Sequence, residues 1–193
     1  MFLDIIKQFN WVDIFVIIIF TRIGYVAIKS SLFNEFFKLL GTILAIYLSL
    51  HYFTNFSDFF RSRISLKSAP LEFLDFFSLA ALAALGYLTL AILREAVSRL
   101  VKIQPLAQLD KLGGLALGLT RAFLLSGLLV FLLAVSTIDY ARHGVKASYS
   151  GSHLFKFVPN IYRGVWHNLA SKFMTKEKFN QTVSEIEEEF KQE

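Results

Sequence analysis

The stretch from Asp110 to Ile138, DKLGGLALGLTRAFLLSGLLVFLLAVSTI, would be apolar on every side of a helix, yet it contains Arg121. It is long enough to cross the roughly 30 Å hydrocarbon core of a bilayer. A surface helix of a soluble protein would have a polar face, and a lipid-facing anchor would not keep a guanidinium inside its apolar run. The stretch therefore predicts a membrane-spanning helix that packs against other helices.

Small residues recur at every fourth position of this segment. They are Gly114, Gly118, Ala122 and Ser126. Small side chains on one helix face let a second membrane helix approach closely. Arg121, three residues after Gly118, lies on the same side of the helix. We interpret this small-residue stripe as intramolecular packing, with a dimer contact as the alternative.

The composition extends the membrane assignment to the whole chain. Hydrophobic residues make up 55% of the 193 residues and charged residues only 18%, and the mean hydropathy is +0.53, which is apolar for a soluble protein. The absence of cysteine excludes disulfides, thiolate nucleophiles and Cys-ligated metals. The net charge of +5 comes from Lys and Arg residues at the ends of apolar runs. This placement favours contact with lipid headgroups over a nucleic-acid partner.

Four segments are long and apolar enough to be spans: 11–28, 36–53, 76–93 and 114–138. An even number predicts that both termini lie on one side of the membrane. Lys and Arg residues flank both sides, so the positive-inside rule does not decide the orientation. The predicted fold is an all-α integral membrane protein, with a bundle of about four transmembrane helices in residues 1–138 and an amphipathic helical tail in residues 139–193.

The tail has two amphipathic parts. Between Leu154 and Phe173, apolar residues that include Trp166 recur at helical spacing opposite basic residues, a pattern that predicts a helix lying on the membrane surface. Beyond it, Phe179 to Phe190 repeats apolar residues at helical spacing, with Thr175 as the expected N-cap. We expect this second helix to pack on the membrane domain or on a second copy.

No pattern in the chain predicts catalysis. The sequence has no P-loop, no GxSxG and no HExxH, and no histidine stands at metal-ligand spacing from a carboxylate within a span. We therefore expect no catalytic residue, no metal site and no cofactor. A membrane-bound hydrolase would require two carboxylates, or a serine and a basic residue, that converge at one depth.

Five ionisable side chains lie at or within the apolar segments: Asp13, Arg22, Glu35, Asp110 and Arg121. A charge that faces lipid costs about 2.5–3.5 kcal/mol on insertion scales, so these groups should face protein, water or each other. Asp13 and Arg22 are too far apart along one helix to pair, at roughly 13 Å. Arg121 is expected to meet Asp13 or Glu35 on a facing helix, either as a structural ion pair or in a polar cavity. The alternative is that these charges lie at the membrane interface because the short spans end there, with Arg22 and Asp110 snorkelling to headgroups.

The order and spacing of these features resemble the bacterial colicin V production protein family. The resemblance rests on NWVDIFVIIIF, on RIGY followed by NEFFKLLG, and above all on DKLGGLALGLTRAFLL, and it covers roughly the first 140 residues. The chain departs from the family's glycine pattern near Ala27 or Lys29. The positions that match are Asp13, Gly24, Glu35, Gly41, Asp110, Gly113, Gly114, Gly118 and Arg121.

The resemblance implies a small multi-pass protein of the bacterial cytoplasmic (inner) membrane that is linked to colicin V export and envelope homeostasis. It implies no established enzymatic activity. We expect a non-enzymatic assembly or accessory factor whose partners are membrane lipids, a second copy bound through the fourth segment or the tail, or other membrane or secretion proteins. The alternative is a small channel or transporter in which Asp13, Arg22 and Arg121 line a polar path.

Overall fold

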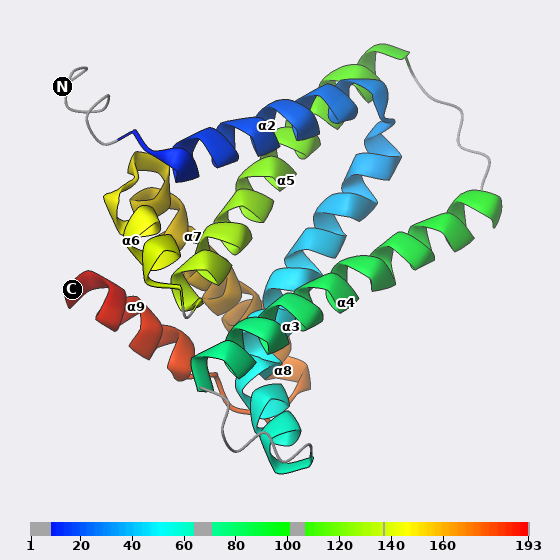
Figure 1. Cartoon of the computed structure of the whole chain (residues 1–193). Helices are drawn as coiled ribbons and strands as arrows, with labels where there is room; N and C mark the ends of the chain where they lie inside the picture. Colours follow the sequence, from blue (N-terminus) through cyan, green and yellow to red (C-terminus); the bar gives the residue numbers. More distant parts are fainter. Residues whose placement is uncertain (1–8, 64–70, 101–106, 137, 193) are drawn as a thin grey trace.

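Four long helices dominate the computed structural model of the chain (Figure 1), which describes residues 9–63, 71–100, 107–136 and 138–192. They are α2 (Trp11–Lys29), α3 (Leu32–Arg63), α4 (Leu71–Leu100) and α5 (Ala107–Val135). Each contains a stretch that is long and apolar enough to cross a membrane. The described residues contain helices and no strands, so the predicted all-α membrane bundle is confirmed.

The helices extend beyond the predicted spans of the second and third segments. The predicted second span ends at residue 53, whereas α3 continues to Arg63, and α4 continues to Leu100 instead of ending near residue 93. In α3 the extension is amphipathic: Phe56 and Phe60, one turn apart, pack with ring centroids at 4.8 Å. A span is predicted from a run of apolar residues, so the prediction ends where the sequence becomes more polar even when the helix continues.

The first span is nearly as predicted, whereas the fourth is shifted at both ends. Helix α2 runs to Lys29, close to prediction, and a short turn at Ser30 leads directly into α3. Helix α5 begins at Ala107 and ends at Val135, so its start lies earlier than the predicted residue 114 and its end earlier than residue 138.

The four helices form two antiparallel pairs, α2 with α5 and α3 with α4, and α5 also packs on α3 (Figure 1). Glycine allows the closest approach of α3 and α4, because a Cβ on Gly86 would lie 2.8 Å from the Cα of Ala45. The start of the first span meets the end of the fourth, where Trp11 stacks on Tyr140 at 5.7 Å. The start of α2 thus lies beside the segment that follows α5, while the side of the membrane on which the termini lie stays a prediction.

Five shorter elements follow α5: α6 (Asp139–Ala147), α7 (Tyr149–Val165), a π-helical turn η1 (Trp166–Ala170), α8 (Ser171–Phe173) and α9 (Thr182–Gln192). Helix α7 packs on α5, α3 and α2. Its apolar residues Leu154, Val158 and Tyr162 are buried in the core of the bundle. A Cβ on Gly127 of α5 would lie only 2.8 Å from a methyl group of Val158, so this glycine makes room for α7.

The apolar face of the first tail helix lies mainly against the spans. Its expected position on the membrane surface stays a prediction. An amphipathic face has the same sequence pattern whether it covers protein or lipid. Leu169 and Phe173 at the end of this region do remain exposed.

The last helix packs on the domain, as one of the two predicted alternatives states, but it begins at Thr182 instead of just after Thr175. Phe190 of α9 stacks on Phe155 of α7 with ring centroids at 4.0 Å. The helix starts late because the side chain of Asn180 is used at its beginning, where Oδ1 accepts a hydrogen bond from the Thr182 N–H.

Candidate functional site

A buried ion cluster joins α3 to α5. Nη2 of Arg121 lies 2.9 Å from Oε2 of Glu35, and the Arg121 and Glu35 side chains are 8% and 0% exposed. The other oxygen of Glu35 lies 2.6 Å from Nζ of Lys38, one turn further along α3. Of the two carboxylates expected opposite Arg121, Glu35 therefore makes the contact. Because Glu35 is in the first turn of α3, the positive end of the helix dipole stabilises its negative charge as well.

The small-residue stripe of α5 supports this cluster from within the chain. Gly114, Gly118, Ala122 and Ser126 are all buried. A Cβ on Gly114 would lie 3.0 Å from the carbonyl oxygen of Ser30, and a Cβ on Gly118 would overlap the side chain of Ala27. The stripe thus lets the α2–α3 turn sit directly on α5, in the intramolecular arrangement.

Asp13, the other expected partner of Arg121, lies at the beginning of α2. Its carboxylate completes a capping box with Asn10, accepting a hydrogen bond of 2.9 Å from the Asn10 N–H. The second oxygen accepts hydrogen bonds from the backbone N–H of Ser150 at 2.8 Å and from the Ser150 hydroxyl. Asp13 therefore ties the start of α2 to the start of α7.

Asp110 has a comparable role at the other end of the α2–α5 pair. Its Oδ1 accepts a hydrogen bond of 3.1 Å from the N–H of Leu32, the first residue of α3. The first four N–H groups of a helix have no partner within it. Asp110 therefore acts as an N-terminal cap for α3 that is supplied from another helix.

Arg22 is placed differently from the other four charged residues. It is exposed on the outer side of α2, and it makes no hydrogen bond or ion pair within the described part of the chain. The five ionisable residues of the apolar segments thus have different surroundings: Glu35 and Arg121 pair, Asp13 and Asp110 cap helices, and Arg22 faces outward.

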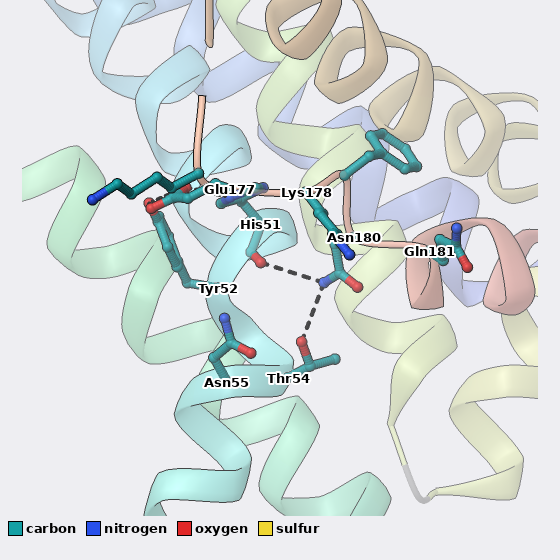
Figure 2. Close-up of a pocket in the computed structure, with 10 residues that line it drawn as sticks. His51, Tyr52, Thr54, Asn55, Glu177, Lys178, Asn180 and Gln181 are labelled. Atoms are coloured by element: carbon teal, nitrogen blue, oxygen red, sulfur yellow. Dashed lines mark hydrogen bonds and ion pairs between the residues drawn. The ribbon is translucent and has the colours of Figure 1, made fainter. Parts of the chain in front are cut away.

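A polar pocket that the sequence does not predict lies between α3 and the segment that leads into α9 (Figure 2). Its volume is about 640 Å³. Figure 2 shows the side-chain amide of Asn180 reaching toward α3, where it donates to the carbonyl oxygen of His51 and, at 3.4 Å, to the Thr54 hydroxyl. The same amide donates to the carbonyl oxygen of Leu50 at 2.9 Å.

His51 is buried at the edge of this pocket and both of its ring nitrogens have partners. Nδ1 lies 2.8 Å from the Tyr162 hydroxyl, and Nε2 lies 2.8 Å from a carboxylate oxygen of Glu177. The Tyr162 oxygen also accepts a hydrogen bond from the Asn180 N–H. A neutral imidazole protonated on Nε2 satisfies every partner, because Nε2–H donates to Glu177 and Nδ1 accepts from Tyr162.

The protonation states of Glu177 and Tyr162, the two partners of His51, follow from their surroundings. The hydrogen bond that the Tyr52 hydroxyl donates holds the pKa of Glu177 below its ordinary value. Burial raises the pKa of Tyr162 to about 12. Glu177 is therefore a carboxylate and Tyr162 a neutral hydroxyl at neutral pH, which makes the network around His51 a set of structural hydrogen bonds between α3, α7 and the 174–181 segment.

Sequence reasoning did not predict this network. His51 stands at the end of the predicted second span, and its partners Tyr162 and Glu177 lie 111 and 126 residues further along the chain. No local spacing joins residues so far apart. Among the described residues, no group of three or more His, Asp or Glu side chains is placed to hold a metal ion.

A sequence model of the family described as colicin V production protein matches residues 12–161 of the chain. The chain belongs to the colicin V production protein family. The match begins in α2, includes the whole ion cluster, and extends through most of α7. It thus passes residue 138, the predicted end of the membrane domain, and it stops before Glu177 and Asn180.

Family membership and the four long apolar helices together indicate a multi-pass membrane protein of colicin V production. No curated protein and no solved structure matches the chain.

Proposed function

We propose that this colicin V production protein is a non-enzymatic assembly factor of the bacterial inner membrane, which supports colicin V production and envelope homeostasis by associating with other membrane proteins. One observation carries the proposal. The buried charges of the spans hold helices to one another, as in the 2.9 Å contact between Arg121 and Glu35, and they do not converge on a common cavity.

The hydrogen bonds of the remaining candidates support the same proposal. Both ring nitrogens of His51 are hydrogen-bonded within the chain, to Tyr162 and to Glu177, and the His51 side chain is buried. Asp13 is occupied by Asn10 and Ser150. These polar groups stabilise the bundle, whereas an active site or a transport path would require some of them to face a substrate.

The outer surfaces of the bundle supply the room for assembly. Helices α2 and α4 are the least buried of the four spans. Large apolar side chains such as Ile17 and Ile18 on α2, and Leu88 and Ile92 on α4, are more than half exposed. Because the small-residue stripe of α5 is covered within the chain, association is proposed to use these outer faces instead of the stripe.

The decisive experiment replaces the ion pair and measures function. The double variant Glu35→Met, Arg121→Met is produced in a bacterium that lacks its own family member, and both colicin V production and leakage of a periplasmic enzyme are measured. An assembly factor retains both functions when the pair is replaced by apolar side chains of similar volume. Loss of function in a variant that is folded and present at the wild-type level would contradict the proposal.

A flux assay distinguishes the transporter alternative. Full-length protein in liposomes is expected to give the same proton and ion flux as protein-free liposomes. A flux that the wild type supports and the double variant does not would favour a polar path through Arg121 and would overturn the assembly proposal.

A further inference from the structure

The most unusual exposed residue of the bundle is Arg22, because its depth matches that of the buried Arg121. Helices α2 and α5 run antiparallel, and Phe20 contacts Phe123 with ring centroids at 6.5 Å. One turn later, Gly24 lies beside Leu119. Arg22, between these two contacts, therefore lies at the level of Arg121. The structure supplies Arg121 with a carboxylate at 2.9 Å and, among the residues it describes, supplies none to Arg22.

Arg22 also lies well inside the span. Helix α2 has 19 residues, and Arg22 is roughly 10 Å from Lys29 and 16 Å from Trp11 at 1.5 Å per residue. Lys29 is the nearer end, but Cα–Cβ bonds lean toward the N-terminus of a helix, which here is the more distant end. An arginine at such a depth costs about 2.5–3.5 kcal/mol on insertion scales that already include snorkelling.

The surroundings of Arg22 form one continuous outward stripe. Ile18, Arg22, Tyr25 and Lys29 follow one another at spacings of four, three and four, and all are exposed. Nζ of Lys29 lies 4.2 Å from the centroid of the Tyr25 ring. This Arg22 face thus combines an apolar surface toward Trp11, a single cation at mid-depth, and an aromatic side chain near the end of the helix.

We propose that the Arg22 face docks a transmembrane helix of another membrane protein that carries a carboxylate at mid-depth. The inference rests on the proposed assembly function and names the surface and the chemistry of the partner. An aspartate or glutamate inside a membrane helix is stabilised when a cation lies beside it. Arg22 can supply that cation, as Arg121 does for Glu35. Lipid phosphates do not, because they lie outside the hydrocarbon.

A second copy of the chain does not fit the same face. Two copies related by a twofold axis through α2 would bring Arg22 against Arg22. The exposed carboxylates on the described parts of the spans, Asp58 and Glu95, lie near the ends of α3 and α4. They lie on α3 and α4, so neither would face Arg22 across a twofold axis through α2, and the carboxylate is proposed to come from a different protein.

The first test uses a synthetic helix as the probe. Full-length protein labelled with a donor dye is reconstituted in lipid vesicles, and energy transfer is measured to a membrane-spanning polyleucine peptide with one central glutamate or with leucine instead. Interhelical polar contacts contribute about 0.6–2 kcal/mol, so the glutamate peptide should bind about 3- to 30-fold more tightly. Equal binding of the two peptides would overturn the proposal.

Three variants show whether Arg22 is responsible. Arg22→Leu should abolish the preference for the glutamate peptide, while Arg22→Lys should retain part of it. Arg99→Leu, which removes an exposed cation near the end of α4, is the matched control and should leave the preference unchanged. Because Arg22 has no partner within the described residues, Arg22→Leu should unfold at the wild-type detergent concentration. A preference that survives Arg22→Leu would refute the assignment.

The second test separates this inference from the proposed function. A photoactivatable residue is placed at Tyr25 on the Arg22 face or at Leu85 on the outer face of α4, and the crosslinked proteins are identified by mass spectrometry in cells. Arg22-dependent crosslinks from Tyr25 to a protein with a carboxylate inside a span support the proposal. Crosslinks from Leu85 alone, or from Tyr25 to a second copy, would refute it but leave assembly intact. Crosslinks from neither position would refute both.

Discussion

The ion cluster of Glu35 predicts that its members contribute unequally to stability. Replacing Glu35 with Met leaves Arg121, whose side chain is 8% exposed, as a buried charge without a carboxylate. Removal of one partner from a buried pair costs about 3–5 kcal/mol. Replacing Arg121 with Met is expected to cost less, about 1–3 kcal/mol, which is the range for leaving a buried polar group without one of its partners. The reason is that Glu35 keeps Lys38 at 2.6 Å.

The double variant Glu35→Met, Arg121→Met should be more stable than the Glu35→Met single variant. It leaves only Lys38 without its carboxylate, and that side chain is 17% exposed and remains within 3.3 Å of the Ser30 hydroxyl. Methionine is close to both residues in volume, so the net loss should stay within about 1.5 kcal/mol of the wild type. The two substitutions are thus strongly non-additive.

Unfolding by sodium dodecyl sulfate in mixed micelles measures these differences, with far-UV circular dichroism and the fluorescence of Trp11 and Trp166 as probes. The exposed pair of Arg99 and Glu95, whose side chains are 77% and 57% exposed, provides the control, because Arg99→Met should change stability by less than about 1 kcal/mol. The reasoning is refuted if Arg121→Met is as destabilising as Glu35→Met, or if the double variant loses the sum of the two single losses.

Three further predictions concern other contacts. Gly118→Leu should separate α5 from α2 and lower the unfolding midpoint, whereas Gly164→Ala, where a Cβ meets nothing within 4 Å, should raise stability by about 0.5–1 kcal/mol; a similar effect of both changes would contradict the packing. Asp110→Ala should cost about 1 kcal/mol by uncapping α3, and Asp110→Asn much less, in the same unfolding assay. The pKa of Glu177 is lowered in the folded chain, so the ionised Glu177 stabilises the fold above the ordinary pKa of 4.5, and this contribution is lost as the pH falls through the folded pKa. Glu177→Gln should therefore destabilise the protein at pH 7 and have no effect in acid. A difference in stability that does not depend on pH would refute this account.

The spans and the charged cluster could be predicted from the sequence. Each span depends on a local run of apolar residues, and the cluster depends on a small number of charged residues. A long apolar run has one stable environment, and a buried arginine needs one of very few carboxylates. Glu35 and Asp13 could not be ranked without knowing which helix faces α5. In the structure Glu35 pairs with Arg121, because the tight turn at Ser30 places the first turn of α3 beside Gly118.

The position of α7 and the network of His51 were not accessible in the same way. The apolar face of α7 predicts burial but not the surface that covers it. Gly127, one residue after the stripe, was the available signal, since it makes room for Val158. The contact of His51 with Glu177 joins residues 126 positions apart, and nothing in the local sequence of either residue indicates the other.

The burial of α7 against α2, α3 and α5 has a consequence for biosynthesis. Its binding surface exists only after the fourth span has been synthesised and has packed into the membrane. Ser150 then reaches back to Asp13, across 137 residues of chain. Until the ribosome has released this final part, the inserted spans present an open apolar surface to the membrane. Docking of α7 is therefore a late step of folding, because it covers a surface that the four spans must first form together.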